Sequence, residues 1–246
     1  MNRGVNMPFS EELKNEIFEY CNRDLPDINE LEKQMEIIQN ADLKKRIIQE
    51  FKAIRFAYKL YEGIEAKEEN LIFEVRNQLL AYASIYEAII ESVLSTYYSD
   101  TEEYNSMMTH KKLIPVDIPA DKRGKLKNCL QHNGEEIFTY VKREKRRPDQ
   151  EIKFKEKIET AKSLGLIHNF IAKDGELIRF PEEIDEIYGI RNGIHLIAER
   201  KKNITYEIEL SKKAYWRMQP FMRQIIEKLK RDEKITIDND ENIVLK

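Results

Sequence analysis

The fold of this chain is decided by the stretch AKEENLIFEVRNQLLAYASIYEAIIESVLSTYY, residues 66–98. This stretch contains neither proline nor glycine, and its apolar side chains recur every three or four residues. Such spacing is typical of an α-helix, and an apolar stripe this wide needs partners on more than one side. We therefore expect a long helix at the centre of the protein. The stripe consists of Leu71, Val75, Leu79, Tyr82, Ala83, Tyr86, Ile89, Ile90 and Val93.

Helical periodicity continues on both sides of this stretch. It predicts further helices over residues 9–22, 27–39, 41–63, 151–167, 181–200 and 211–231. Ser10 and Ser211 are placed to cap the first and the last of these, and Gly165 is placed to end the helix that starts at 151. Pro181 suits a first helical turn, whereas Pro220 predicts a kink or a local break. The fold class is therefore mostly α.

The remaining segments set the domain organisation. Residues 99–150 concentrate prolines and glycines among many charges, which predicts a polar insertion. Alternating side chains predict minor β-structure at 204–210 and a small hairpin at 234–245. We expect residues 1–65 to be an N-terminal helical extension packed on a helical domain of residues 66–246. Together they are expected to form one compact unit.

Composition excludes several classes of protein. Hydrophobic residues make up 41% of the 246 residues and charged residues 35%, which is typical of a soluble globular chain. No uninterrupted apolar run approaches the roughly 20 residues that cross a bilayer. Cys21 and Cys129 lack metal-type spacing and are interpreted as reduced thiols of a cytoplasmic protein without a membrane partner. A net charge of −3 excludes a uniformly basic protein, although a local basic patch can still bind nucleic acid.

The helix expected at PEEIDEIYGIRNGIHLIAER, residues 181–200, separates its polar and apolar residues most clearly. At 3.6 residues per turn, one side carries only isoleucines. The other side carries Arg191, His195, Tyr188, Asn192 and Glu199. Arg191 and His195 are four residues apart, so their side chains are neighbours.

This pair of side chains suits chemistry on a phosphodiester. Histidine gives and takes protons near neutral pH, and arginine offers a forked, permanently charged donor to phosphate oxygens. In RNA the ribose 2′-OH is a built-in nucleophile, so a base and a cation suffice without a metal or another cofactor. Asn192 is placed to orient either group by hydrogen bonding. The alternatives are a solvated helix face or a local salt bridge to Glu199.

The segment YGIRNGIHLIAER resembles the signature helix of HEPN-domain proteins, the helical family of many prokaryotic toxin and defence ribonucleases. Arg191, Asn192 and His195 match the family motif as R-N-G-I-H, with three intervening residues where four to six are commonest. Residues 75–94 and 154–167 resemble the family's long helix and the helix before the signature helix. The resemblance covers about residues 66–230.

The resemblance implies a HEPN-like antiparallel helical bundle and a metal-independent endoribonuclease that acts as a toxin or anti-phage effector. Cleavage would leave a 2′,3′-cyclic phosphate. Arg191 would stabilise phosphate charge and His195 would act as general base or acid. Family members commonly form homodimers in which two signature helices face each other. The implied partners are RNA, with tRNA as one candidate, and an antitoxin or a sensor protein.

Other residues are assigned supporting roles. Tyr188 is placed to stack on a base or bind a phosphate, and Glu87 on the central helix and Glu199 are candidates to orient the Arg–His pair. Glu87 facing solvent is the alternative. Arg200, Lys201 and Lys202 follow the histidine and are the predicted RNA-binding residues. The basic runs at 121–127 and 142–147 are interpreted as solvated faces, with phosphate binding as the alternative.

Two glycines on the same helix bear on assembly. Gly189 and Gly193 each cost roughly 1 kcal/mol relative to alanine, and close approach of another helix would offset that cost. A kinked helix is the alternative. Two functions therefore stand at this point: a metal-independent endoribonuclease, and a non-catalytic helical module for dimerisation or partner binding.

Overall fold

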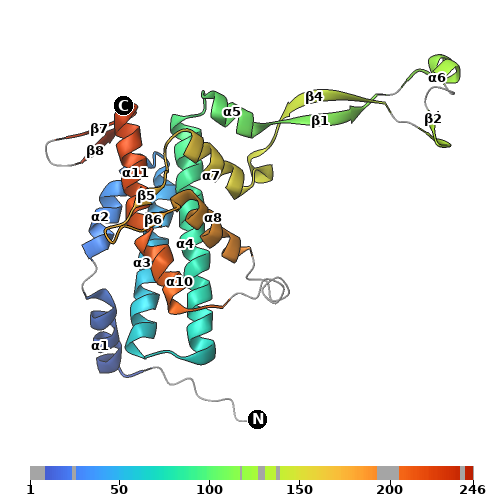
Figure 1. The fold of residues 1–246 in the computed structure, drawn as a ribbon. Coiled ribbons are helices and arrows are strands. Elements are labelled where there is room, and N and C mark those ends of the chain that lie inside the picture. The colour runs from blue at the N-terminus through green and yellow to red at the C-terminus, as the bar shows by residue number, and fades with distance from the viewer. Residues whose placement is uncertain are drawn as a thin grey trace, which may run out of the picture. The chain divides into compact units, whose positions relative to one another are not determined.

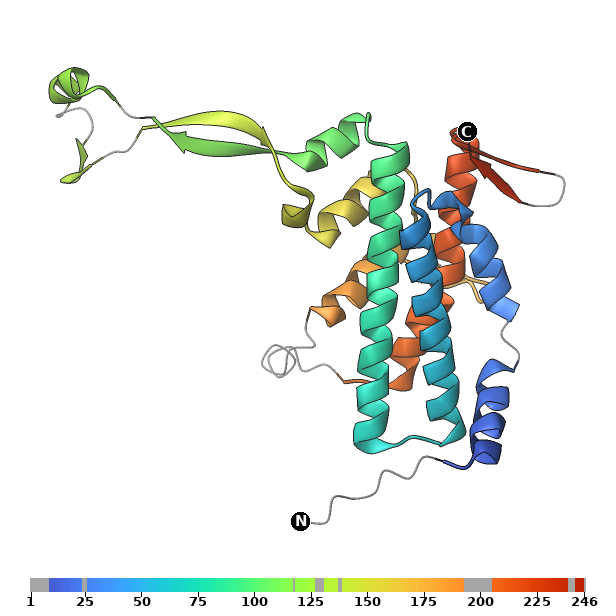
Figure 2. The same cartoon turned by 180° about the vertical axis from the view of Figure 1, so that it is seen from behind.

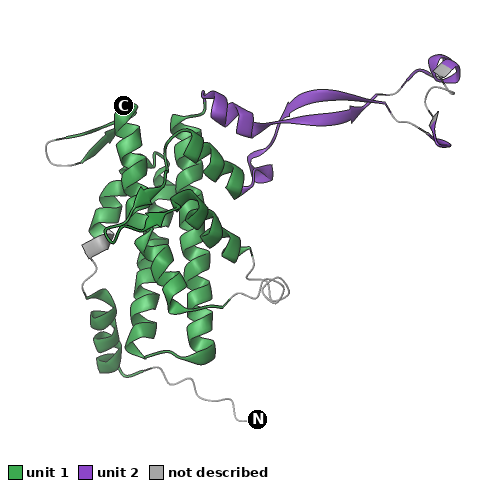
Figure 3. Cartoon of the chain, viewed as in Figure 1, with its two compact units in different colours: residues 1–99, 154–246 green, residues 100–153 purple. Residues whose placement is uncertain are grey.

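The computed structural model describes residues 9–23, 26–116, 118–126, 131–136, 139–192, 205–238 and 242–245. The chain divides into two compact units, a helical unit of residues 1–99 and 154–246 and a second unit of residues 100–153 (Figure 3). The second unit lies between two helices of the first in sequence, close to the limits expected for the polar insertion at 99–150. Each unit is described by itself below.

The helical unit is built around α4, Glu68–Tyr97 (Figure 1). A short loop after α3, Ala41–Gly63, returns the chain so that α3 and α4 run antiparallel (Figure 2). The other faces of α4 contact three helices: α7 (Phe154–Ser163), α8 (Phe180–Arg191) and α10 (Ile208–Trp216). The central helix expected from the sequence is thus confirmed, with all of its stripe buried except Leu71.

Tyrosines of α4 lie in the core with their hydroxyls bonded to other elements. Tyr86 is fully buried and donates to the carbonyl of Ala214 at 2.8 Å. Tyr97 donates to the carbonyl of Ile37 at 2.7 Å. By length and composition α4 could cross a membrane, yet 56% of its most apolar window is buried inside the protein. This burial is that of a core helix.

Smaller elements complete the helical unit. Ser10 caps α1, Glu11–Asn22, as expected, by accepting from the Leu13 amide. The other helical elements are α2 (Pro26–Gln34), the 3₁₀ turn η1 (Met35–Ile37) and α11 (Met218–Arg231). Two hairpins are formed by β5 (Phe170–Ile171) with β6 (Leu177–Ile178) and by β7 (Ile235–Ile237) with β8 (Ile243–Leu245). The last hairpin confirms the β-structure expected at 234–245. Its predicted turn at Asn239 and Asp240 lies outside the described residues.

Gly165 ends α7 in the way that the sequence indicates. Its φ is +74°, a left-handed conformation that favours glycine. The Gly165 amide donates to Lys162, and the next amide, of Leu166, donates to Ala161. This pair of bonds is the Schellman arrangement, which satisfies carbonyls at the end of a helix.

The second unit contains a long antiparallel ribbon. The helix α5, Glu102–Met108, leads into β1, Thr109–Pro115, which pairs with β4, Tyr140–Arg146. Between these strands lie α6, Ala120–Leu126, and the two-residue strands β2, Gln131–His132, and β3, Glu135–Glu136. The 3₁₀ turn η2, Asp149–Glu151, follows the ribbon.

Two expectations near the C-terminus were wrong. No strand forms in the described part of 204–210, because α10 begins at Ile208. Ser211 is no helix cap; it lies inside α10, is 1% exposed, and hydrogen-bonds to Gln78 of α4. Packing against α4 therefore overrides the alternating pattern. The predicted break does occur, because α10 ends at Trp216 and α11 begins at Met218. In a continuous helix the ring of Pro220 would clash with the carbonyl of Trp216, four residues earlier.

Candidate functional site

The contact between α4 and α8 brings together three of the predicted site residues. The two carboxylate oxygens of Glu87 on α4 each accept one hydrogen bond from α8. The Tyr188 hydroxyl donates to Oε1 at 2.9 Å, and Arg191 Nη1 donates to Oε2 at 2.8 Å. Glu87 therefore does not face solvent alone, and the alternative interpretation of this residue is wrong. We call Glu87, Tyr188 and Arg191 the carboxylate cluster.

The sequence of α8 explains why Tyr188 and Arg191 point the same way. Pro181 lies in its first turn, as expected, and Ile184 and Ile187 are 0% and 3% exposed. These isoleucines hold one side of α8 against the core. Tyr188 and Arg191 are three residues apart, so both lie on the next side of the helix, toward α4.

Tyr188 is held on both its hydroxyl and its ring. Phe154, in the first turn of α7, stacks on the ring with centroids 4.1 Å apart and planes inclined by 24°. The Arg191 guanidinium carbon lies 5.0 Å from the centroid of the same ring. Burial, followed by the hydrogen bond and charge of Glu87, raises the pKa of Tyr188 to about 12, although Arg191 opposes the shift. The phenol is therefore a neutral hydrogen-bond donor at neutral pH.

Arg191 is oriented but still accessible. Its side chain is 30% exposed, and that of Glu87 is 24% exposed. A guanidinium carries five N–H donors, so one hydrogen bond to Glu87 leaves donors for an incoming ligand. The pair has no net charge, however, and its attraction for an anion is weaker than that of an unpaired arginine.

Neighbouring ion pairs fix the helices that carry the carboxylate cluster. One turn further along α4, Glu91 accepts from Lys157 of α7 at 2.6 Å, and the Lys157 side chain is only 7% exposed. Glu183 of α8 binds Lys213 at 3.0 Å and also Arg217. Burial raises the pKa of Glu183, but the two cations outweigh that effect and hold the pKa below its ordinary value.

The other predicted site residues fall into two groups. Asn192 is exposed and follows the last residue of α8, where its backbone N–H donates to the carbonyl of Tyr188. The remaining predicted residues lie outside the described part of the chain: His195, Glu199, Arg200, Lys201 and Lys202. The expected continuation of the signature helix over 193–200 lies there too. The neighbouring placement of Arg191 and His195 thus stays a prediction.

Sequence reasoning missed Phe154 and Lys157 of α7. Phe154 stacks on Tyr188 of α8, and Lys157 donates to Glu91 of α4. The spacing of Phe154 and Lys157 was the one signal in the sequence, since residues three apart on the predicted helix before α8 share one side of it. Among the described residues, no group of three or more histidine, cysteine, aspartate or glutamate side chains could hold a metal ion. Cys21 is a buried free thiol, and Cys129 is not described.

Gly189 lies in α8 beside the cluster. Beyond its own helix and chain neighbours, a Cβ built on it would meet no described atom within 4 Å, so contacts among the described residues do not require a glycine there. Gly193 is outside the described residues. A close approach of two signature helices in a homodimer accordingly stays a prediction.

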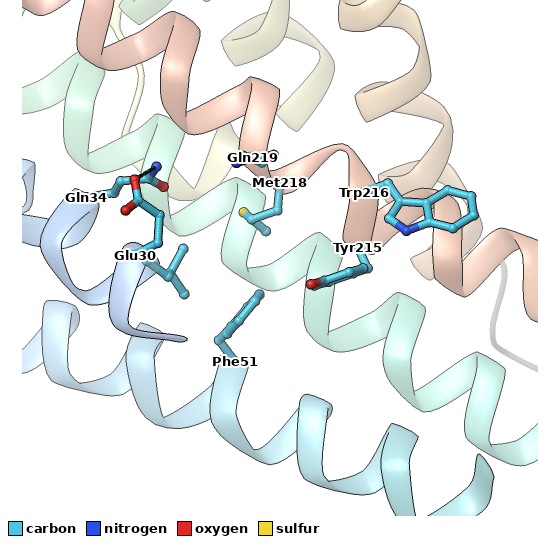
Figure 4. Close-up of a pocket in the computed structure, with 8 residues that line it drawn as sticks. Glu30, Gln34, Phe51, Tyr215, Trp216, Met218 and Gln219 are labelled. Carbon is cyan, nitrogen blue, oxygen red and sulfur yellow. Dashed lines mark hydrogen bonds between the residues drawn. The ribbon is translucent and has the colours of Figure 1, made fainter. Parts of the chain in front are cut away.

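A separate pocket lies between α2, α3 and the α10–α11 junction (Figure 4). Its volume is about 390 Å³, and Phe51, Tyr215 and Met218 point into it. Glu30 and Gln34, which are joined by a 2.9 Å hydrogen bond, lie at one end, and Trp216, 60% exposed, lies at the other. Leu31 and Gln219 complete the lining, which shares no residue with the carboxylate cluster.

Comparison with known proteins adds no further constraint: no family model, curated protein or solved structure matches this chain.

Proposed function

We propose that this protein is a metal-independent endoribonuclease of HEPN type, acting in the cytoplasm as a toxin or anti-phage effector. The observation that supports the proposal best is the carboxylate cluster. Glu87 holds Tyr188 and Arg191 on one side of α8, and Arg191, the last residue of α8, is the first residue of the R-N-G-I-H motif. A positioned donor of this kind stabilises charge without having to reorganise during the reaction.

The reaction follows from the chemistry of the motif. His195 removes the proton from a ribose 2′-OH, and the 2′ oxygen attacks the adjacent phosphorus. The bond from phosphorus to the 5′ oxygen breaks, and the leaving oxygen takes a proton from water or from the protonated His195, which gives a 2′,3′-cyclic phosphate and a 5′-OH. Arg191 binds the phosphate oxygens as negative charge builds up on them. Asn192 orients the phosphate or His195, and Tyr188 fixes the guanidinium or contacts a base.

Substrate attraction is assigned to other residues, because Glu87 neutralises Arg191 in the free protein. Arg200, Lys201 and Lys202 begin five residues after His195 and supply positive charge in this proposal. Glu199 is a second candidate to orient His195. A homodimer would place two such motifs across one cleft, with an antitoxin or sensor protein as a further partner.

The test is cleavage of total tRNA by the purified full chain in EDTA. Arg191→Ala should slow cleavage by about 10²–10³-fold and His195→Ala by about 10²–10⁴-fold. Glu182→Gln is the matched control, since Glu182 lies on the same helix but forms an exposed ion pair with Lys162. Wild-type rates in both alanine variants, or activity that requires Mg²⁺, would refute the proposal.

The second candidate function is a non-catalytic helical module that dimerises or binds a partner. The pocket of Figure 4 favours it, because an apolar floor beside an exposed tryptophan suits an inserted apolar side chain. Trp216 lies at one end of this pocket and is the only tryptophan in the sequence, so its fluorescence reports on a partner bound at that end. Partner-dependent fluorescence change together with no RNA cleavage would favour the module.

A further inference from the structure

The β1–β4 ribbon separates its side chains into two chemically different faces. Residues directly opposite each other in an antiparallel pair lie on the same face, and successive residues alternate between faces. The register pairs His110 with Lys145 and Lys112 with Arg143 on one face. We call these four residues, which share their face with Ile114 and Val141, the cationic face. The opposite, mixed face includes Thr109, Lys111, Lys142, Glu144 and Arg146.

The cationic face holds positive charge that no described residue of the chain neutralises. Lys112, Arg143 and Lys145 are exposed, and within the described residues none of them forms an ion pair. On the mixed face, by contrast, Lys111 lies 3.8 Å from Glu144 directly opposite. Like charges in direct opposition destabilise a strand pair. The ribbon therefore tolerates an unfavourable pairing on one face only.

The side chains of the cationic face indicate which anion it suits. A row of exposed lysine and arginine side chains is the usual electrostatic footprint of a protein that binds nucleic-acid backbones. Single-strand binding typically adds aromatic side chains on which bases stack, and the cationic face has no phenylalanine, tyrosine or tryptophan. Asparagine and glutamine, which read base edges, are absent from this face as well. These features favour contact with the phosphates of a double-helical stem, without sequence readout.

We propose that the cationic face of the β1–β4 ribbon binds the phosphate backbone of double-helical RNA. The choice of RNA over DNA rests on the proposed function, for which the ribbon would recruit the substrate. The cation–phosphate contacts themselves depend only on the register and charges of the ribbon. Binding should be strongly salt-dependent and insensitive to the base sequence of the stem.

The experiment measures fluorescence anisotropy of the full chain with a labelled 2′-O-methyl RNA hairpin, whose blocked 2′-OH prevents cleavage. The variant Lys112→Glu/Arg143→Glu reverses one directly opposed pair of the cationic face. The control, Lys142→Glu/Arg146→Glu, makes the same charge change on the mixed face of the same ribbon. A DNA hairpin of the same sequence provides the second ligand. Circular dichroism melts verify that both variants fold.

We expect the cationic-face variant to weaken RNA binding at least tenfold and the mixed-face control to weaken it much less. The slope of log Kd against log salt should fall by about 2 in the cationic-face variant, about 1 for each side chain that no longer neutralises a phosphate. Equal losses of affinity in both variants, or unchanged binding in the first, would overturn the inference. Tighter binding of the DNA hairpin would overturn the choice of RNA.

The two proposals fail in distinguishable ways. Face-specific binding by a wild-type protein that cleaves no RNA would support this inference and refute the endoribonuclease. Wild-type binding and cleavage in Lys112→Glu/Arg143→Glu would refute this inference and leave the endoribonuclease standing.

Discussion

Replacing Glu87 with glutamine tests whether the carboxylate cluster joins α4 to α8. The substitution keeps the size of the side chain but removes its charge. Tyr188 and Arg191 each donate to a different carboxylate oxygen. Glutamine offers one acceptor for Arg191 and one NH₂ group, which the Tyr188 hydroxyl can meet only by turning from donor to acceptor. Both bonds then lose the charge of the carboxylate, which is what made them strong. We expect a lower free energy of unfolding for Glu87→Gln.

The size of the effect follows from exposure. A hydrogen bond that involves a charged group typically contributes about 1.5–3 kcal/mol when buried, and exposed ion pairs contribute about 0.2–1 kcal/mol. Glu87 and Arg191 are 24% and 30% exposed, which places their bond between these limits. Together with the Tyr188 hydrogen bond, we expect the free energy of unfolding to fall by about 2 kcal/mol. For a chain of this length that lowers Tm by about 4–8 °C.

Glu182→Gln is the matched control for this measurement. The Glu182–Lys162 pair also joins α8 to α7 at 2.7 Å, but both side chains are 48% exposed. Its removal should cost less than about 0.5 kcal/mol. A double-mutant cycle of Glu87→Gln with Arg191→Met, followed by thermal and urea melts, isolates the pairwise energy. A coupling energy near zero, or equal losses of stability for Glu87→Gln and Glu182→Gln, would refute the reasoning.

Three further predictions concern stability. Burial raises the pKa of Glu74, so ionisation of this side chain costs stability as pH rises above about 4.3. The variant Glu74→Gln should therefore raise Tm at pH 7.5 but not at pH 3.5. An equal gain in Tm at both pH values would contradict this prediction. Glu183, with its lowered pKa, should contribute stability above about pH 4.3 that disappears at lower pH, so Glu183→Gln should flatten the acid side of the Tm–pH curve. Gly165→Ala should lower stability by about 1–2 kcal/mol because φ is +74°, while Gly189→Ala, in open helix, should gain up to about 1 kcal/mol in the same denaturant melts.

The helical unit was largely predictable because burial leaves a strong trace in sequence. The stripe of α4 repeats at helical spacing, and the ends of α1 and α7 carry a capping serine and a left-handed glycine. The ribbon was not predictable from alternation. Both of its faces are largely exposed and both carry charged residues, so its strands lack the contrast between apolar and polar positions that marks a half-buried strand.

The candidate site was predictable only in part, for a related reason. Periodicity places Tyr188 and Arg191 on one side of α8, but it cannot say which side of α4 meets them. Glu87 is 104 residues from Arg191 in sequence, and only the packing of α8 on α4 brings the two together. The stacking of Phe154 on Tyr188 has the same origin, since no local pattern links these residues.

Because the Glu87–Arg191 pair has no net charge, the two proposals assign different tasks to the two units. Glu87 already orients Arg191, and in the proposed reaction an oriented arginine is suited to stabilising charge rather than to capturing a distant anion. Long-range attraction requires unpaired charge, and the cationic face of the ribbon supplies it on Lys112, Arg143 and Lys145. If the proposals hold, loss of Arg191 slows turnover at saturating RNA, whereas reversal of the cationic face raises the RNA concentration needed for saturation. The two defects then separate as a change in kcat and a change in KM.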